Sequence, residues 1–372
     1  MTGTRADYGI MAPVMRAIAE SGKAELQVVA TNMHLSERFG MTVNEVEADG
    51  FRVDARVDSL LPGDRALDVA KSMAGAEAGL ADAFEELRPD LVVVLGDRYE
   101  ALAAASVAVV FNIPVAHLHG GETTEGAIDD RFRHAITQLS TYHFAATPQY
   151  VDKIISLGAR PEYVFHSGAP GAEIREEGED MRELALEFEE KTGIRAGEAF
   201  ILFAFHPVTI LEDKGIEELK ATLEAMAPFI KEGYRVLVTL PNSDPGNEGI
   251  RSALEDWASR YPEVSLVKSL GSRLFHYAME YGSAMVGNSS AALIEAPSHR
   301  LGAVNVGIRQ KGRAHGLTVV DAPGDAEKIG RMLKAVMSLE MKSVLLGMSV
   351  ASLNPYYKEN SAAFIANKLI DI

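Results

Sequence analysis

Short runs of apolar residues alternate with longer amphipathic stretches along most of this chain. Unbroken apolar runs predict strands at residues 26–30, 91–95, 114–118 and 142–146. Runs without polar alternation are typical of parallel strands that helices cover on both faces. Apolar positions at helical spacing predict helices at residues 66–87, 101–111 and 130–140. Strand–helix–strand repetition of this kind indicates a doubly wound α/β sheet.

The same rhythm restarts after a charged stretch at residues 173–180. Further strands are predicted at residues 200–205, 235–240, 265–267, 283–287 and 302–306, with helices at 216–231 and 249–261. We therefore expect two α/β domains that join near residues 168–180. The final segment, residues 361–372, also has helical spacing.

The beginning of the chain lacks one expected element. Residues 3–9 resemble a strand-to-helix loop, and residues 10–20 resemble the amphipathic helix that such a loop opens. In a doubly wound domain the strand ahead of this loop is normally central. Only Met1 and Thr2 precede the loop in the sequence.

Composition narrows the possible partners. The 372 residues include 36 Lys+Arg and 53 Asp+Glu, which gives a formal net charge of −17. Nucleic acids and anionic membranes are bound through clustered Lys and Arg, so neither is an expected partner. The absence of cysteine excludes disulfides, thiolate metal sites and a cysteine nucleophile, and it fits a reducing compartment. Because the sequence shows no signal peptide and no long apolar span, we expect a cytoplasmic protein.

Acid–base residues of the first half gather where predicted strands end, which is the edge at which open α/β sheets bind ligands. Asp97 follows one strand, where it could also simply cap the next helix. His119, Glu122 and Asp129 follow another, and Arg133 lies one helical turn beyond Asp129. Their spacing matches no closed zinc pattern, so we predict no metal. The alternative is a solvated loop ahead of a helix with an acidic first turn.

Polar residues of the second half also follow predicted strands. His206 and Asn242 each occupy such a position, where either could be purely structural. Ser289 and the serine after it stand at a predicted helix start, which suits a phosphate but also a simple N-cap. Glu295 falls about two turns into that helix, within reach of a ligand hydroxyl. Arg309 begins the main basic cluster of this acidic chain, which suits a diphosphate.

Seven short motifs occur in a recognisable order. They are GTRADYG at residues 3–9, GDRYE at 96–100, HLHGGE at 117–122, IDD at 128–130, HPVT at 206–209, GNSS at 287–290 and RQKGR at 309–313. Together they resemble the UDP-N-acetylglucosamine 2-epimerases, specifically the hydrolysing branch that feeds sialic-acid synthesis. The resemblance extends to about residue 320 and returns at residues 354–356.

This resemblance implies an α/β fold of two Rossmann-like domains in a GT-B arrangement, with the active site in the interdomain cleft. The N-terminal domain would comprise residues 1–170 and carry the catalytic side. The C-terminal domain would comprise residues 171–355 and bind UDP, and residues 356–372 would form a helix that packs back on the N-terminal domain. The resemblance also implies a UDP-sugar substrate, a homodimer or homotetramer, and no cofactor.

The family's reaction removes the C2 proton and UDP from UDP-GlcNAc to give 2-acetamidoglucal, and then adds water to release N-acetylmannosamine. By resemblance, the catalytic residues would be Asp97, His119, Glu122, Asp129, Arg133 and His206. The UDP of the substrate would be held by Arg5, Arg98, His206, Asn242, Ser289, Ser290, Glu295 and Arg309. Non-hydrolysing relatives have a catalytic Glu at the position of His119, so either His119 or a carboxylate could be the C2 base.

Other functions stay open at this stage. The same chemistry could act on a UDP-2,4-diacetamido-trideoxyhexose, whereas the His119 position disfavours the non-hydrolysing epimerase, whose product stays linked to UDP. A glycosyltransferase of the same architecture would need fewer carboxylates than cluster at residues 119–130. A non-catalytic nucleotide-sugar sensor would bind UDP but turn nothing over.

Overall fold

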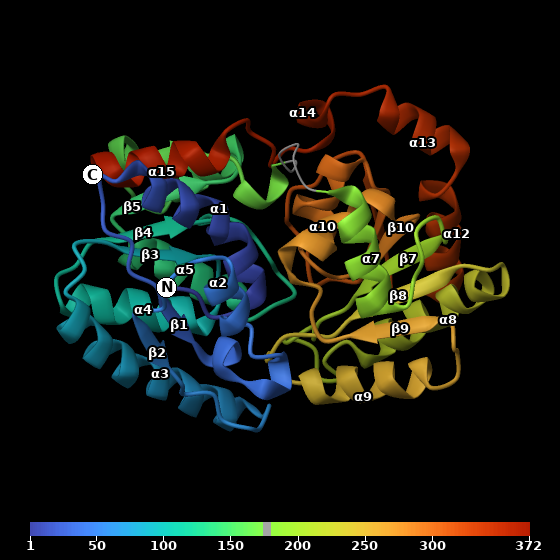
Figure 1. Cartoon of the computed structure of the whole chain (residues 1–372), viewed down its shortest axis with the longest axis horizontal. Coiled ribbons are helices and arrows are strands. Elements are labelled where there is room, and N and C mark those ends of the chain that lie inside the picture. The colour runs from blue at the N-terminus through green and yellow to red at the C-terminus, as the bar shows by residue number, and fades with distance from the viewer. Residues whose placement is uncertain (174–179) are drawn as a thin grey trace. The chain divides into compact units, whose positions relative to one another are not determined.

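The computed structural model describes residues 1–173 and 180–372, so most of the charged stretch at 173–180 lies outside the described residues. The chain forms two compact units, each built on parallel strands (Figure 1). Unit 1 comprises Met1–Thr123, Ile128–Glu173 and Tyr356–Ile372, and unit 2 comprises Thr124–Ala127 and the described part of residues 174–355. The predicted α/β fold class with two Rossmann-like units is confirmed.

All the named strands of unit 1 run parallel. β1 (Val29–Thr31) pairs with β2 (Ala55–Val57), and a second sheet has the order β3 (Val92–Leu95), β4 (Val115–Leu118), β5 (Tyr142–Ala145), β6 (Val164–His166). The helices are α1 (Arg5–Ser21), α2 (Val43–Ala48), α3 (Ala66–Leu87), α4 (Tyr99–Val110), α5 (Asp129–Leu139), α6 (Pro148–Ser156) and α15 (Ser361–Asp371).

Helices cover both faces of the sheet that contains β3 in unit 1. On one face α3 and α4 pack against the buried side chains of Val92 and Val94. On the other face α1 and α15 pack against each other, and Val14 and Ile365 share one apolar cluster there. Because successive strand side chains point to opposite faces, both sets of positions must be apolar, and the strand becomes an unbroken apolar run.

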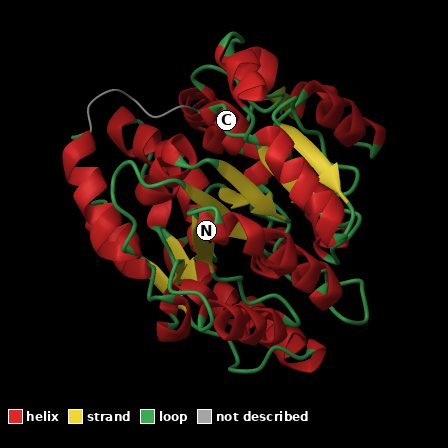
Figure 2. Cartoon of the chain, turned by 90° about the vertical axis from the view of Figure 1, so that its right-hand side faces the viewer, coloured by secondary structure: helices red, strands yellow, loops and turns green. Residues whose placement is uncertain are grey.

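Unit 2 contains one parallel sheet with β7 at its centre. The strand order is β12 (Val319–Ala322), β11 (Ala303–Val306), β10 (Ala284–Gly287), β7 (Phe200–Ala204), β8 (Arg235–Thr239), β9 (Val264–Val267). One face is covered by α8 (Ile216–Lys231), α9 (Asn247–Ala258) and α12 (Ala326–Val336), and the other by α7 (Met181–Thr192) and α10 (Gly271–Tyr281). Short helices α11 (Ala291–Ile294), α13 (Leu339–Leu346) and α14 (Val350–Leu353) complete the unit. Figure 2 shows the strands lying between layers of helices.

Sequence patterning located the long elements accurately. The predicted helices at 66–87 and 216–231 coincide with α3 and α8. The strands β2, β6 and β12 are not predicted, because each is only three or four residues long and mixes buried positions with half-buried or exposed ones. Across the part of the chain that is described, no helix combines the length and apolar character needed to cross a bilayer.

Candidate active site

His119 and Glu122 form a buried acid–base pair at the end of β4. His119 Nδ1 lies 2.6 Å from Glu122 Oε1, and neither side chain is more than 5% exposed. His119 has a positive φ of 61°. This conformation costs a non-glycine residue about 1–2 kcal/mol and is common at functional sites. Two hydrogen bonds hold it, from the His119 N–H to the Phe144 carbonyl and from Arg133 Nη1 to the His119 carbonyl.

The other ring nitrogen of His119 is not used by the fold. His119 Nε2 is buried and has no hydrogen-bond partner among residues 1–173 and 180–372. Because the Glu122 carboxylate accepts from Nδ1, the neutral imidazole carries its proton on Nδ1 and its lone pair on Nε2. The pair can therefore take up and return a proton at Nε2, with Glu122 stabilising the imidazolium.

Arg133 connects this pair to Asp97. The Arg133 guanidinium, on α5, forms ion pairs with Asp97 Oδ2 and with Glu122 Oε2, the latter at 3.4 Å. The Asp97 side chain is 23% exposed, whereas that of Glu122 is completely buried. Asp97 is therefore the more accessible carboxylate of this cluster, whereas Glu122 is closed off from solvent. The N-cap residue of α4 is Arg98, and no side chain caps this helix. The alternative that Asp97 is a helix cap is therefore wrong.

His117 supports the turn that carries Asp97. Its Nε2 donates a hydrogen bond to the Gly96 carbonyl over 2.7 Å. Gly96 has a φ of 77°, so this tight turn after β3 favours glycine. Burial lowers the pKa of His117 to about 3, and the ring is neutral at physiological pH. His117 is thus a positioning residue.

Arg5 and Arg98 are both in unit 1, and each has acidic neighbours. Arg98 Nε lies 3.2 Å from Glu100 Oε2, with both side chains almost fully buried. Burial raises the pKa of Asp7 to about 6, an effect that Arg98 opposes and Glu100 reinforces. Burial lowers the pKa of Arg5 to about 10, while Glu45 favours its charged form. Asp7 and Glu100 were not singled out from the sequence, although both fall within the quoted motifs at 3–9 and 96–100.

Asn288 organises the corresponding loops of unit 2. Its Oδ1 accepts from the His206 N–H at 2.7 Å and its Nδ2 donates to the His206 carbonyl at 2.8 Å. The Asn288 carbonyl accepts from Arg309 Nη1 at 3.2 Å and from Gln310 Nε2 at 2.9 Å. This fully buried residue lies in the quoted GNSS motif but was not singled out from the sequence, because an Asn after a strand resembles an ordinary turn residue.

Residues Thr124–Ala127 pack on the Arg309 loop within unit 2. The Glu125 N–H donates to the Lys311 carbonyl at 3.1 Å, and Lys311 Nζ lies 2.9 Å from Glu125 Oε2. A Cβ atom on Gly126 would lie 2.3 Å from the Ile308 carbonyl oxygen, so the two backbones pass too closely for a side chain. The loop that carries His119 thus contributes residues to both units.

Glu295 lies at the end of a short helix. A helix does begin just after the two serines, but α11 ends at Ile294 and Glu295 is its C-cap, so the prediction that Glu295 lies two turns inside the helix is wrong. The α-helix cannot continue through Pro297, because proline has no N–H to donate to the Leu293 carbonyl, and a short 3₁₀ turn, η5 (Ala296–His299), follows. Burial raises the pKa of Glu295 to about 7. Hydroxyl donors from a ligand would stabilise the ionised carboxylate.

The remaining predicted site residues lie at strand or helix ends of their own units. Asp129 is half-buried in the first turn of α5. Asn242 and Ser290 are half-buried in unit 2; Ser290 is the N-cap of α11 without a side-chain cap, and the Ser289 hydroxyl accepts from the Ala291 N–H at 3.4 Å. Within the described ranges, no group of three or more His, Asp or Glu is arranged to hold a metal ion.

The chain is similar to proteins of one known family. Residues 16–370 match the family model described as UDP-N-acetylglucosamine 2-epimerase. The chain belongs to this family. It is 36% identical over 322 residues to the UDP-N,N'-diacetylbacillosamine 2-epimerase (hydrolyzing) of Legionella pneumophila, a match that covers 86% of this chain and 83% of that protein. It is 31% identical over 364 residues to the polysialic acid biosynthesis protein P7 of Escherichia coli, covering 97% and 90%.

A solved structure shares the fold of this epimerase-family protein. The UDP-GlcNAc 2-epimerase of Neisseria meningitidis, solved bound to UDP-GlcNAc, superposes with a TM-score of 0.82. The match covers 100% of this chain and 98% of that one, at 18% sequence identity. The family resemblance identified from the seven motifs is therefore confirmed.

Proposed function

We propose that this epimerase-family protein is a hydrolysing 2-epimerase of a UDP-2-acetamido sugar. The observation that carries the proposal is the buried His119–Glu122 pair with its unpartnered Nε2, which Arg133 connects to the reachable carboxylate of Asp97. This cluster supplies two separate acid–base groups, and the proposed reaction needs two.

The reaction consists of an elimination and an addition. In the elimination a base removes the C2 proton, the C2–H electron pair forms a C1=C2 double bond, and the C1–O bond breaks so that UDP leaves with its electrons. In the addition a water hydroxyl bonds to C1 and a proton is delivered to C2 on the opposite face. The sum is UDP-sugar plus water giving UDP plus the free 2-epimer.

We assign the C2 proton to Asp97 and the water step to His119. Asp97 is the more exposed carboxylate, and Arg133 holds it in place. Glu122 fixes the tautomer and orientation of His119, so that Nε2 can accept a proton from water. A lone carboxylate is a weak base for a C–H proton, and a site that excludes water would strengthen it.

The unit 2 loops would bind UDP. Arg309 supplies positive charge to the diphosphate, and Glu295 accepts hydrogen bonds from the ribose hydroxyls. The close contact between the backbones of Gly126 and Ile308 supports the UDP role of the Arg309 loop, because it fixes this loop against the segment that follows Glu122. The Neisseria meningitidis relative with this fold was solved with UDP-GlcNAc, which supports a ligand of this class.

The name of the Legionella pneumophila relative favours UDP-N,N'-diacetylbacillosamine as the preferred sugar. UDP-GlcNAc is the second candidate, because the matching family model is described by that substrate. Incubation of the protein with each sugar in deuterated water, followed by NMR, tests both. We expect a free 2-epimer that carries deuterium at C2, together with UDP, and faster turnover of the diacetamido sugar. A product that stays linked to UDP, or no turnover of either sugar, would contradict the proposal.

A further inference from the structure

Glu295 lies in a turn of unit 2 that its own backbone bonds only partly stabilise. The Glu295 N–H donates to the Ala291 carbonyl and the Ser298 N–H donates to the Glu295 carbonyl, both at 3.0 Å. The Ile294 carbonyl lacks the two usual helical donors, because Pro297 has no N–H and the Ser298 N–H is already used. This end of α11 therefore needs a hydrogen-bond donor from elsewhere in the chain.

The donor comes from Asn354, the C-cap residue of α14. Asn354 Nδ2 donates to the Ile294 carbonyl and to the Ser298 hydroxyl, both at 2.8 Å. A carbonyl oxygen can only accept, so the amide nitrogen of Asn354, and not its oxygen, must face Ile294. The two amide hydrogens thus bind on both sides of Glu295 in the sequence.

Asn354 is itself held firmly in place. It is 1% exposed, and its N–H donates to the Val350 carbonyl at 2.8 Å. A Cβ atom on Gly316 would lie 1.6 Å from the carbonyl oxygen of the fully buried Leu353, so the two backbones pass too closely for a side chain. A fixed donor is suited to orienting another residue, because it has little rotamer freedom left to lose when its hydrogen bonds form.

The Glu295 carboxylate is the group that this arrangement can orient. Burial raises its pKa to about 7, because removing water from the carboxylate disfavours the ionised form. Hydrogen bonds weaken steeply as their angle departs from linearity. A binding group must therefore be held within about 0.5 Å of its productive position, and a single helical turn beside a proline does not provide this alone.

We propose that Asn354 is a positioning residue for UDP binding, which donates on both sides of Glu295 and holds its carboxylate where it accepts from the ribose hydroxyls. This inference rests on the proposed function, which assigns the ribose contact to Glu295. It also gives a role to the start of the NPY sequence at residues 354–356, which the proposed function does not use. Because Asn354 acts through Glu295, its removal should weaken UDP binding only when Glu295 is present.

A double-mutant cycle tests this dependence. UDP affinity is measured by calorimetry at pH 8 for the unmodified protein, Asn354→Ala, Glu295→Ala and the double variant. Asn354→Ala should weaken UDP binding about fivefold or more, because hydrogen bonds to a charged group are among the stronger ones. In the Glu295→Ala background the same substitution should change the affinity by less than about twofold. Asn354→Ala should also reduce the rise in UDP affinity between pH 6 and pH 8 that Glu295 produces.

Ser298→Ala is a milder second variant. It removes one of the two acceptors of Asn354 and leaves the hydrogen bond to Ile294, so it gives the answer if Asn354→Ala does not fold. It should weaken UDP binding about twofold to threefold when Glu295 is present, and it should have no effect in the Glu295→Ala background.

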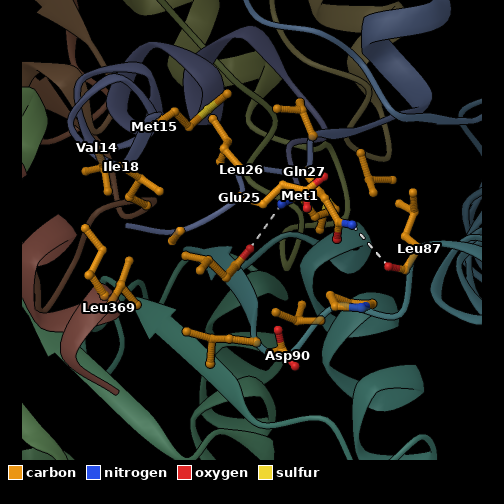
Figure 3. A pocket seen from close by; sticks show the side chains of 18 of the residues that line it. Met1, Val14, Met15, Ile18, Glu25, Leu26, Gln27, Leu87, Asp90 and Leu369 are labelled. Atoms are coloured by element: carbon orange, nitrogen blue, oxygen red, sulfur yellow. Dashed lines mark hydrogen bonds between the residues drawn. The ribbon is translucent and has the colours of Figure 1, made fainter. Parts of the chain in front are cut away.

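Two variants control for a general loss of stability. Ile329 is fully buried on α12, in a different apolar cluster from Leu293 of α11. Val14 is fully buried on α1, beside a cavity of about 690 Å³ in unit 1 (Figure 3). Ile329→Ala and Val14→Ala should lower the thermal midpoint but leave UDP affinity within about twofold of the unmodified protein.

The possible outcomes separate this inference from the proposed activity. An Asn354→Ala effect of equal size with and without Glu295, or no effect in either background, would overturn the inference and leave the proposed epimerase in place. Unchanged UDP affinity in Glu295→Ala would remove the ribose contact and this inference with it. Turnover of the UDP sugars by the unmodified protein, followed by NMR, tests the epimerase separately.

Discussion

At the scale of single residues, Arg133 decides how the acid–base groups of unit 1 are arranged. It is almost completely buried and contacts two carboxylates and one backbone carbonyl. The two carboxylates differ in solvent exposure: Glu122 is enclosed by Arg133 and His119, whereas Asp97 retains a solvent-facing side. This difference in exposure is the reason why we propose that Asp97 removes the C2 proton and that Glu122 orients His119.

The substitution Asp97→Asn should reduce kcat/KM by about 10³-fold or more, because the amide cannot accept the C2 proton. UDP affinity, measured by calorimetry, should stay within about twofold, since Asp97 is not among the proposed UDP contacts. Asp130→Asn is the matched control, because Asp130 is an acidic residue of α5 that forms an ion pair with His134. Near-normal turnover by Asp97→Asn would refute the catalytic assignment.

Glu295 should make UDP binding depend on pH. Its pKa is about 7, and the ionised form is the one that accepts from ribose hydroxyls. UDP affinity should therefore increase between pH 6 and pH 8, by at most about tenfold per pH unit below the pKa. Calorimetric titration across this range measures the effect. In Glu295→Gln the step should disappear, and a step that persists in this variant would assign it to another group.

The free protein should show the opposite trend from the same residue. The carboxyl pKa in the folded state lies above its ordinary value of 4.5, so the folded state holds the proton more tightly than the unfolded chain does. The Glu295 contribution to stability is thus present below pH 4.5 and is lost as the pH rises toward 7. At pH 8 the Glu295→Gln protein should unfold at a higher urea concentration than the unmodified protein, and a lower midpoint would contradict this.

At the scale of elements, a short backbone segment packs against the Arg309 loop of unit 2. Thr124–Ala127 lies against the Arg309 loop, and Gly126 is the point of closest approach. Gly126 does not have a positive φ, so its backbone conformation does not require glycine. Glycine is required because a side chain would clash with the Ile308 carbonyl.

Gly126→Ala should therefore displace either this segment or the Arg309 loop. We expect a loss of about 1–3 kcal/mol in the free energy of unfolding and a weaker affinity for UDP. Urea denaturation and calorimetry measure the two effects. Gly249→Ala, in the first turn of α9, is the control, because its added Cβ would lie 3.6 Å from Ile216 Cδ1, an ordinary contact distance. It should leave UDP affinity unchanged. A Gly126→Ala protein with normal stability and affinity would show that the contact is not needed.

At the scale of the whole molecule, the last segment of the chain completes the first unit. Tyr356–Ile372 belongs to unit 1, and α15 packs on α1. The Tyr356 carbonyl accepts from the Ala169 N–H at 2.9 Å, which places this segment beside the end of β6. Residues from both ends of the chain thus share one apolar cluster.

Ile365→Ala should lower the free energy of unfolding by about 2–5 kcal/mol, because Ile365 is fully buried and the cavity would not be refilled. Asn367→Ala, on the exposed side of the same helix, should stay within about 0.5 kcal/mol. Urea denaturation of both proteins measures the difference. If the two variants were equally stable, α15 would not be part of the unit 1 core.

The sequence alone determined the two parallel α/β units, the positions of α3 and α8, and the family, because continuous apolar runs and ordered loop motifs are local features. It also located the loops on which Asp97, His119 and Glu122 lie. Only the tertiary structure decided that Arg133 contacts Asp97, that Asn288 joins three loops, and that Thr124–Ala127 belongs to unit 2. These features depend on contacts between segments that are distant in sequence, and the local pattern of apolar residues does not predict which segments will be in contact.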